Sequence, residues 1–225
     1  MFVGFICAMK EEATSLIKSL EGVKKEEHRG YSFHLGKRGK NTLVVTTSGV
    51  GKVNMAVCTT ILLDRYHVDY VINYGVAGSI NTKIGETVVS DAVRYYDFYI
   101  PEQVQSTKRP VYQVPYQPYP YKPSDDILNA CKNILKDEVE FGTIISGDQF
   151  VINKSQLGDC PKDGVVAVDM ESAAVSQVCY LFSTDFIIIR SISDNLSGEE
   201  FTGNLSHSIE RGYKLALKFV DNYSK

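Results

Sequence analysis

The sequence predicts an α/β fold, a single-domain three-layer sandwich with a mixed, mostly parallel central sheet flanked by helices. Short runs rich in valine, isoleucine and aromatic residues alternate with longer segments of helical periodicity, which is the pattern of this fold class. The runs are almost continuously apolar, as in strands buried on both faces. With 225 residues, 44% of them hydrophobic, the chain is long enough for one large core. We therefore expect a single domain over residues 1–225.

The first half of the chain opens on the apolar run FVGFICA, whose β-branched and aromatic residues favour a strand. A helix is expected next, because Ala13, Leu16, Ile17 and Leu20 recur three and four positions apart and share one face. TLVVTTSG then has the composition of a buried strand. In order, we expect a strand at 2–8, a helix at 9–20, a strand at 42–49, a helix at 53–66, and strands at 69–75 and 85–95.

The second half repeats the alternation. It begins with an amphipathic segment for which Ser124 is the expected N-cap, because its hydroxyl can accept a hydrogen bond from a free backbone N–H of the first turn. In order, we expect a helix at 125–137, strands at 141–147 and 164–169, a helix at 170–182, a strand at 185–193 and a closing helix at 205–223.

Residues 95–126 differ from the rest, because they hold six of the seven prolines and many of the tyrosines. Proline prevents a regular helix or a central strand. Disordered segments are poor in aromatic residues, which argues against disorder here. We expect an ordered excursion that packs on a neighbouring subunit or at the mouth of a pocket.

The composition of the chain disfavours several classes of binding partner. The net charge is −3 and no long basic run occurs, which disfavours nucleic acid and anionic membranes as partners. The five cysteines are scattered without a CxxC pair, and the four histidines lack metal-ligand spacing, so we expect no disulfide framework, metal or cofactor. A basic leader and a membrane-spanning apolar run are both missing from the sequence, which favours a cytoplasmic protein.

Glycines and carboxylates gather where the predicted strands end. These strand-end segments are residues 8–12, 48–52, 73–78, 147–150, 169–171 and 193–195. Ligands of doubly wound sheets bind beyond the carboxyl ends of the strands, so the segments predict one composite site. Taken singly they are weak signals. SGVGK lacks the Walker spacing and GVAGS lacks the dinucleotide spacing, and Glu11, Glu12 and Asp194 could each serve a helix start or turn.

Glu171 is the hardest of these acids to explain as a helix cap. It stands among Val168, Ala173, Ala174 and Val175, and burying an isolated carboxylate is costly. Glu171 is therefore the acid in these segments that is hardest to dismiss as a functional residue.

Seven motifs occur in an order that covers nearly the whole chain. They are AMKEE at 8–12, SGVGKV at 48–53, NYGVAG at 73–78, VVSDAVRYYD at 88–97, SGDQF at 146–150, VDMESAA at 168–174 and RSISD at 190–194. Together they resemble the 5′-methylthioadenosine/S-adenosylhomocysteine nucleosidases, a family within the purine nucleoside phosphorylase and nucleosidase superfamily.

The resemblance implies hydrolysis of the N-glycosidic bond of a small-molecule nucleoside. The substrates would be 5′-methylthioadenosine and S-adenosylhomocysteine, with 5′-deoxyadenosine as a further one, and the products adenine and the thioribose. Asp194 would be the general acid that protonates purine N7, and Glu12 would activate water. Glu171 would hold the ribose 2′ and 3′ hydroxyls, because a carboxylate accepts two hydroxyl donors well.

The same resemblance implies the residues that bind substrate. Phe150 would stack on the adenine and Val151 would read its edge through backbone groups. Asp169 would be a supporting residue. Separately from the resemblance, Arg190 precedes Asp194 on the same predicted strand, so we expect Arg190 to support Asp194. The implied binding residues are Met9, Val50, Val76, Pro115, Phe150, Val151, Asp169, Met170, Ser193 and Phe201. Among them Met9, Val50 and Phe201 would line the slot for the 5′-alkylthio group, and Met170 would pack on the sugar.

The chain departs from the family pattern in three places. Val76 stands where the family often has serine, so a hydrogen bond near the purine acid is either absent or supplied elsewhere. Asp169 replaces a glutamate. The family's Asp-Val-Thr-Ala-Phe-Gly-Tyr segment, which sends an aromatic side chain into the neighbour's 5′ pocket, is replaced by DFYIPEQVQSTKRPVY at 97–112. Pro115 would match a proline of that contact, and the resemblance implies a homodimer.

Three alternatives stay open. A phosphorylase would need cationic and amide donors for phosphate, whereas the first loop offers Lys10 beside Glu11 and Glu12, which favours water. A hydrolase of another purine nucleoside, such as futalosine or AMP, is compatible with the altered segment at 97–112. A non-catalytic nucleoside-binding protein would be expected to lose Glu12, Glu171 or Asp194, and the chain has all three.

Overall fold

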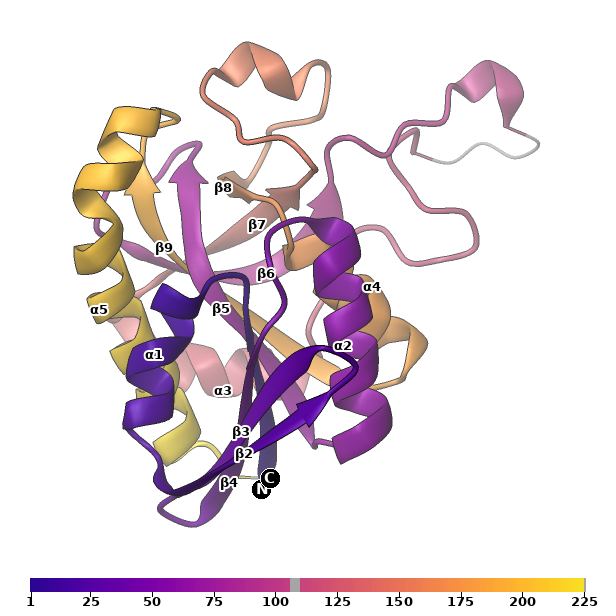
Figure 1. The fold of residues 1–225 in the computed structure, drawn as a ribbon. Helices are drawn as coiled ribbons and strands as arrows, with labels where there is room; N and C mark the ends of the chain where they lie inside the picture. The colour runs from indigo at the N-terminus through magenta and orange to yellow at the C-terminus, as the bar shows by residue number, and fades with distance from the viewer. Residues whose placement is uncertain (106–109, 225) are drawn as a thin grey trace.

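The computed structural model describes residues 1–105 and 110–224 and shows one mixed sheet between two layers of helices (Figure 1). Within these residues the sheet has nine strands. They are β1 (Phe2–Cys7), β2 (Glu21–His28), β3 (Tyr31–Arg38), β4 (Asn41–Thr47), β5 (Tyr70–Ser79), β6 (Thr87–Tyr95), β7 (Glu140–Ser146), β8 (Val165–Asp169) and β9 (Asp185–Asp194). The three-layer α/β prediction is confirmed.

Five α-helices are found in the described residues, two on one face of the sheet and three on the other. They are α1 (Lys10–Lys18), α2 (Lys52–Tyr66), α3 (Asp125–Leu135), α4 (Ser172–Leu181) and α5 (Gly198–Asn222). Apolar side chains of α2 and α4 form one core with the sheet, and those of α1, α3 and α5 form a second core. The two groups of helices lie on opposite faces of the sheet (Figure 1). None of these helices is long and apolar enough to cross a membrane.

The sheet curls on itself at one end. Its strand order is β2-β3-β4-β1-β5-β8-β7-β6-β9, and β9 also pairs with β5. The pairing of β9 is parallel to β5 and antiparallel to β6, so β5, β8, β7, β6 and β9 close a ring. This closure brings the carboxyl ends of β5, β8 and β9 together. Strand periodicity alone contains no information about such long-range pairing.

The hairpin of β2 and β3 was not predicted. Every residue of β2 is exposed or half-buried, and five of its eight residues are charged, as EGVKKEEH shows. It lies at the edge of the sheet, where charged side chains oppose pairing with another chain. Because β2 has no apolar run, its sequence does not indicate a strand.

The closing helix begins earlier than predicted, at Gly198 rather than at residue 205. Gly198 and Gly203 have poor helix propensity, which hid the first turns from the sequence pattern. The correction matters for the site, because it places Phe201 in the first turn of α5.

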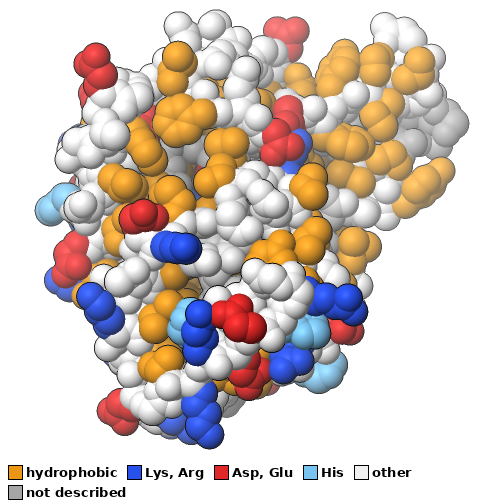
Figure 2. All heavy atoms as spheres, in the orientation of Figure 1, with side chains coloured by type: hydrophobic (Ala, Val, Ile, Leu, Met, Phe, Trp, Pro, Cys, Tyr) orange, Lys and Arg blue, Asp and Glu red, His pale blue; other side chains and the backbone are white. Residues whose placement is uncertain are grey.

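The proline-rich excursion protrudes from the body of the molecule (Figure 1). In its described part, Ile100 N–H donates to the Val111 carbonyl (2.8 Å), and the Tyr99 and Tyr112 rings pack edge to face with centroids 5.5 Å apart. Hydrophobic side chains gather on its surface (Figure 2). Residues 106–109 of the predicted excursion lie outside the described residues, and packing against a partner or a pocket mouth stays a prediction.

Candidate active site

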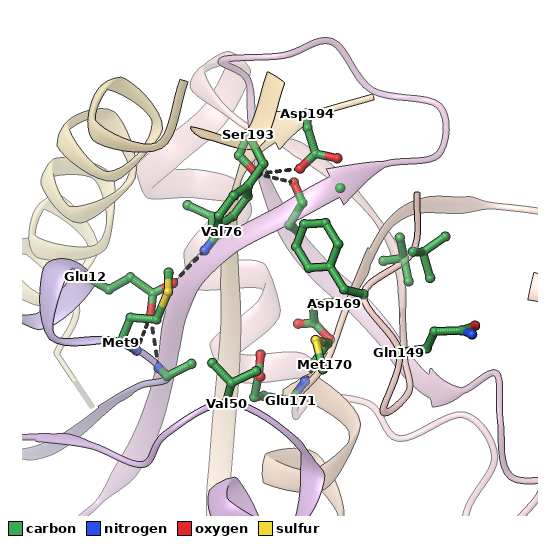
Figure 3. A pocket seen from close by; sticks show the side chains of 17 residues that line it. Met9, Glu12, Val50, Val76, Gln149, Asp169, Met170, Glu171, Ser193 and Asp194 are labelled. Carbon is green, nitrogen blue, oxygen red and sulfur yellow. Dashed lines mark hydrogen bonds between the residues drawn. The ribbon is translucent and has the colours of Figure 1, made fainter. Parts of the chain in front are cut away.

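A cavity of about 300 Å³ opens where β1, β5, β8 and β9 end. Gly78 of β5 pairs with Val168 of the antiparallel β8, so the carboxyl ends of these two strands meet. Parallel pairing adds the ends of β1 and β9 on either side of β5. The cavity is lined by the predicted residues Met9, Glu12, Val50, Val76, Phe150, Val151, Asp169, Met170, Glu171, Ser193, Asp194 and Phe201 (Figure 3).

Pro115 is the predicted site residue that does not line this cavity. It lies in the protruding excursion, and its contact with a partner subunit stays a prediction. Five lining residues were not predicted, namely Ala8, Ala77, Gly78, Gln149 and Val168. Each belongs to a strand-end segment or adjoins one, and that position was the signal that could have found them.

Four carboxylates, those of Glu12, Asp169, Glu171 and Asp194, line the cavity and are all buried. A buried carboxylate persists when it is paired or hydrogen-bonded. Among the residues that the structure describes, no cluster of three or more His, Cys, Asp or Glu side chains could hold a metal ion. The hydrogen bonds of each carboxylate then decide whether it is free to meet a ligand.

Glu12 is held by three backbone N–H groups from two elements. Its Oε2 accepts from Ala8 N (3.0 Å) and Met9 N (2.9 Å), at the junction of β1 and α1. Its Oε1 accepts from Val76 N of β5 (3.0 Å). Burial raises the pKa of Glu12, and the nearby Arg190 charge and these three donors oppose the rise. The carboxylate is therefore fixed in orientation at the cavity wall.

Gly75 makes room for this arrangement. A Cβ atom at position 75 would lie 2.7 Å from Glu12 Oε1 and 3.2 Å from Arg190 Nη1. Both neighbours are hydrogen-bonded and buried, so neither can move at low cost. The close approach of β5 to the Glu12 carboxylate thus explains why residue 75 of NYGVAG is glycine.

Asp194 ends β9 and is oriented from both sides. Its Oδ2 accepts a hydrogen bond from the Ser193 hydroxyl (2.8 Å), and its Oδ1 accepts one from Ser197 N (3.1 Å). Val76 cannot donate from its side chain, but Ser193 supplies a hydroxyl to the acid instead. The sequence left open whether such a donor exists, and the structure answers that it does.

Asp169 is occupied by protein groups. Its Oδ2 lies 2.6 Å from Arg190 Nε, and both side chains are almost fully buried. It also accepts hydrogen bonds from the hydroxyls of Ser146 (2.5 Å) and Ser172. A buried ion pair is tolerated when its remaining hydrogen-bonding capacity is met, as it is here. Asp169 also accepts from the backbone N–H groups of Glu171 and Ser172 and so supports the start of α4, while its role toward a substrate stays a prediction.

The expectation that Arg190 supports Asp194 is wrong. Besides pairing with Asp169, the guanidinium donates to Asn73 Oδ1 (2.5 Å). Four residues along a strand span about 13 Å, which keeps Arg190 away from the end of β9. Its charge acts on Asp169, Glu171 and Glu12.

Glu171 precedes the first turn of α4 and faces the cavity. Its Oε1 accepts from Gly51 N (2.8 Å), while Oε2 has no hydrogen-bond partner among the described residues. Burial and the adjacent Asp169 charge raise the pKa of Glu171 to about 7, with Arg190 and the Gly51 N–H acting in the opposite direction. The second oxygen is therefore available to a hydroxyl donor.

This raised pKa predicts a pH-dependent gain in stability for Glu171→Gln. A carboxyl whose folded pKa exceeds its unfolded value stabilises the fold at low pH, and that contribution is lost as pH rises through the folded pKa. With a shift from 4.5 to about 7, the variant should exceed the parent at pH 8 by up to about 3 kcal/mol. The gain should shrink toward pH 5. Urea unfolding at both pH values measures it, with Glu140→Gln, an exposed glutamate, as control. Equal stability at pH 8 would contradict the prediction.

Two phenylalanines form an aromatic wall of the cavity. Phe150 follows β7, Phe201 comes from α5, and their rings meet edge to face with centroids 5.3 Å apart and an interplanar angle of 83°. Phe150 is 46% exposed, although large aromatic side chains are usually buried. An exposed ring face beside an apolar cavity suits a flat aromatic ligand.

Comparison with known proteins identifies close relatives. The model of the phosphorylase superfamily matches residues 2–221. The 5′-methylthioadenosine/S-adenosylhomocysteine nucleosidase of Exiguobacterium sp. is 37% identical over 215 residues, which cover 89% of this chain and 91% of that protein.

Solved structures share the fold over nearly the whole chain. The nucleosidase of the same name from Colwellia psychrerythraea, in complex with adenine, has a TM-score of 0.88 and 34% identity, covering 98% of this chain and 95% of the other. The native structure of futalosine hydrolase from Helicobacter pylori has a TM-score of 0.90 and 27% identity, covering 99% and 98%.

Proposed function

The chain belongs to the 5′-methylthioadenosine/S-adenosylhomocysteine nucleosidase family of the phosphorylase superfamily and is an N-ribosyl hydrolase, and from this we propose its substrates. It cleaves the N-glycosidic bonds of 5′-methylthioadenosine and S-adenosylhomocysteine, and that of 5′-deoxyadenosine as a lesser substrate. One observation carries the proposal. Glu12, Glu171 and Asp194 come from three distant parts of the chain, yet all three line one cavity beside an aromatic wall.

In the proposed mechanism Asp194 gives a proton to purine N7. The C1′–N9 electron pair then leaves with the adenine, which departs as a neutral molecule. Ser193 and Ser197 fix the orientation of the acid through the hydrogen bonds described above. General acid catalysis of this kind needs the acid within hydrogen-bond reach of the base. The proposal is supported by Phe150 and Asp194 both lining the cavity.

The sugar side of the reaction falls to the two glutamates. Glu12 takes a proton from the water that attacks C1′, so that the new C1′–O bond forms without a free hydronium ion. Glu171 accepts the ribose hydroxyls on Oε2. Positive charge develops on the ribose as the bond to adenine breaks, and buried carboxylates nearby stabilise it. The three backbone donors to Glu12 keep it oriented throughout.

The decisive experiment is adenine release from 5′-methylthioadenosine in phosphate-free buffer and again with phosphate. Equal release in both buffers, with free methylthioribose as the second product, is the expected result. Release that requires phosphate and yields a ribose 1-phosphate would contradict hydrolysis. A chain that leaves methylthioadenosine intact but cleaves futalosine would overturn the substrate assignment.

Futalosine is the second candidate substrate for a specific reason. Residues 97–112 replace the family segment that reaches into the neighbour's 5′ pocket, and a futalosine hydrolase is among the structural neighbours. The 5′ end of the site is therefore where the two substrates would be told apart. Assays of both nucleosides side by side decide between them.

A homodimer is also proposed. Apolar side chains are exposed at the start of α2, namely Val50, Val53 and Val57, and at the end of α4, namely Tyr180, Leu181 and Phe182. Burying such a group against a second copy would be favourable, and the partner's Pro115 would then approach the 5′ end of the cavity. Light scattering during size exclusion should give twice the chain mass of 25.1 kDa. A monomer at micromolar concentration would contradict the proposal.

A further inference from the structure

Lys52, the first residue of α2, contacts the segments that follow β6 and β7 next to the cavity without lining it. Its Nζ donates to both carboxylate oxygens of Asp97 (2.8 and 2.7 Å) and lies 3.5 Å from Asp148 Oδ2. Its backbone N–H donates to Asp148 Oδ1 (2.9 Å), and Asp148 N–H donates to Asp97 Oδ2 (2.8 Å). We refer to Lys52, Asp97 and Asp148 as the clasp. It ties the start of α2 to the segments that follow β6 and β7.

The clasp adjoins the donor that holds Glu171. Gly51 immediately precedes Lys52, and its N–H is the one that donates to Glu171 Oε1 (2.8 Å). The backbone at Gly51 has φ of 98°, a conformation that favours glycine. A Cβ there would lie 3.4 Å from Asp148 Oδ1. The direction of the Gly51 N–H is thus fixed on one side by an unusual turn and on the other by the clasp.

The contribution of the Lys52–Asp97 ion pair to folding stability does not by itself explain this arrangement. The Lys52 and Asp97 side chains are 23% and 28% exposed, and ion pairs with solvent access contribute little to folding. The clasp nevertheless has two backbone hydrogen bonds and a bidentate ion pair directed at one turn. Such a concentration of contacts fits the need to hold a functional group in one geometry.

We propose that Lys52 is a positioning residue that, through the clasp and the Gly51 N–H, holds Glu171 so that its Oε2 faces the ribose hydroxyls. The proposal rests on the proposed function for the identity of the ligand. Lys52 itself does not touch substrate. Its effect passes through Glu171, and this dependence separates positioning from a general effect on folding.

The test is a double-mutant cycle on the full chain. Lys52→Met should raise KM for 5′-methylthioadenosine about tenfold and lower kcat less than threefold, since an interaction that binds the ribose is weakened. In a Glu171→Ala background the same change should cost less than twofold, because no carboxylate is left to position. The matched control is Lys214→Met, which removes an exposed pair with Glu210 on α5 and should stay within twofold of the parent. A tenfold loss in both backgrounds would overturn the proposal.

Asp97→Asn provides a second route if Lys52→Met folds poorly. It removes the charge that binds Lys52 but keeps an oxygen for the Asp148 N–H. It should reproduce the rise in KM, again only when Glu171 is present. If futalosine proves to be the substrate, the cycle is run on futalosine, which presents the same ribose hydroxyls to Glu171.

A readout without substrate separates this proposal from the proposed function. The Gly51 N–H stabilises the Glu171 carboxylate, so loss of the clasp should make that carboxylate more costly to bury. The gain in melting temperature from Glu171→Gln at pH 8 should therefore be larger in the Lys52→Met background than in the parent. An equal gain in both backgrounds would overturn the clasp, whatever the chain hydrolyses.

Discussion

Replacing Asp194 with asparagine should lower kcat for adenine release by about 10²- to 10⁴-fold, the range for loss of a general acid. The amide has no acidic proton for purine N7, so adenine would have to leave as an anion. Asparagine matches the shape of aspartate, and its oxygen can still accept from Ser197 N. We therefore expect the fold and the cavity to survive.

Two measurements distinguish loss of the acid from loss of structure. The melting temperature of Asp194→Asn should stay close to that of the parent. A nitrophenyl riboside, whose leaving group departs without a proton, should be cleaved by the variant at a rate within about tenfold of the parent. Full activity on methylthioadenosine would remove Asp194 from the role of acid, and equal loss on both substrates would indicate a damaged cavity.

The parts of the fold that follow from local chemistry could be predicted from the sequence. β9 has a continuous apolar run because both of its faces are buried, and the same holds for β4. β2 carries charges on an exposed edge, so its sequence resembles that of a loop. The closure of β9 on both β5 and β6 depends on pairing between distant segments, which no local pattern records.

The site shows the same division. Ordered motifs located Glu12, Glu171 and Asp194, since each adjoins a strand end that must meet the others at one edge of the sheet. The predicted partner of Arg190, Asp194, was wrong. Arg190 is close to Asp194 in sequence, but it pairs with the buried Asp169 of another strand, which sequence proximity does not indicate. The clasp was not predicted either, because its residues are far apart in the sequence. Lys52 is separated from Asp97 by 45 residues, and each of the two looks like an ordinary surface charge.

Glu12→Gln should lower kcat by about 10²- to 10⁴-fold, because an amide cannot take a proton from the attacking water. The loss should appear in kcat more than in binding, since Glu12 meets the water rather than the nucleoside. Adenine alone should bind the variant within about threefold of the parent, which calorimetry can measure. Glu11→Gln is the matched control, because Glu11 is the exposed neighbour in the same first turn of α1. Its kcat should stay within about twofold of the parent.

The geometry around Glu12 makes this substitution a strict test. Each carboxylate oxygen of Glu12 faces backbone N–H groups, Ala8 and Met9 on Oε2 and Val76 on Oε1. A glutamine can offer an oxygen to only one of these sets, and its NH₂ group must face a donor on the other side. This mismatched hydrogen bond destabilises the fold, whereas the loss of a buried charge stabilises it. Because the two effects oppose each other, the melting temperature should change little. Activity retained with the amide in place would mean that water is activated elsewhere. Loss of activity together with loss of adenine binding would mean that Glu12 shapes the cavity rather than serves as the base.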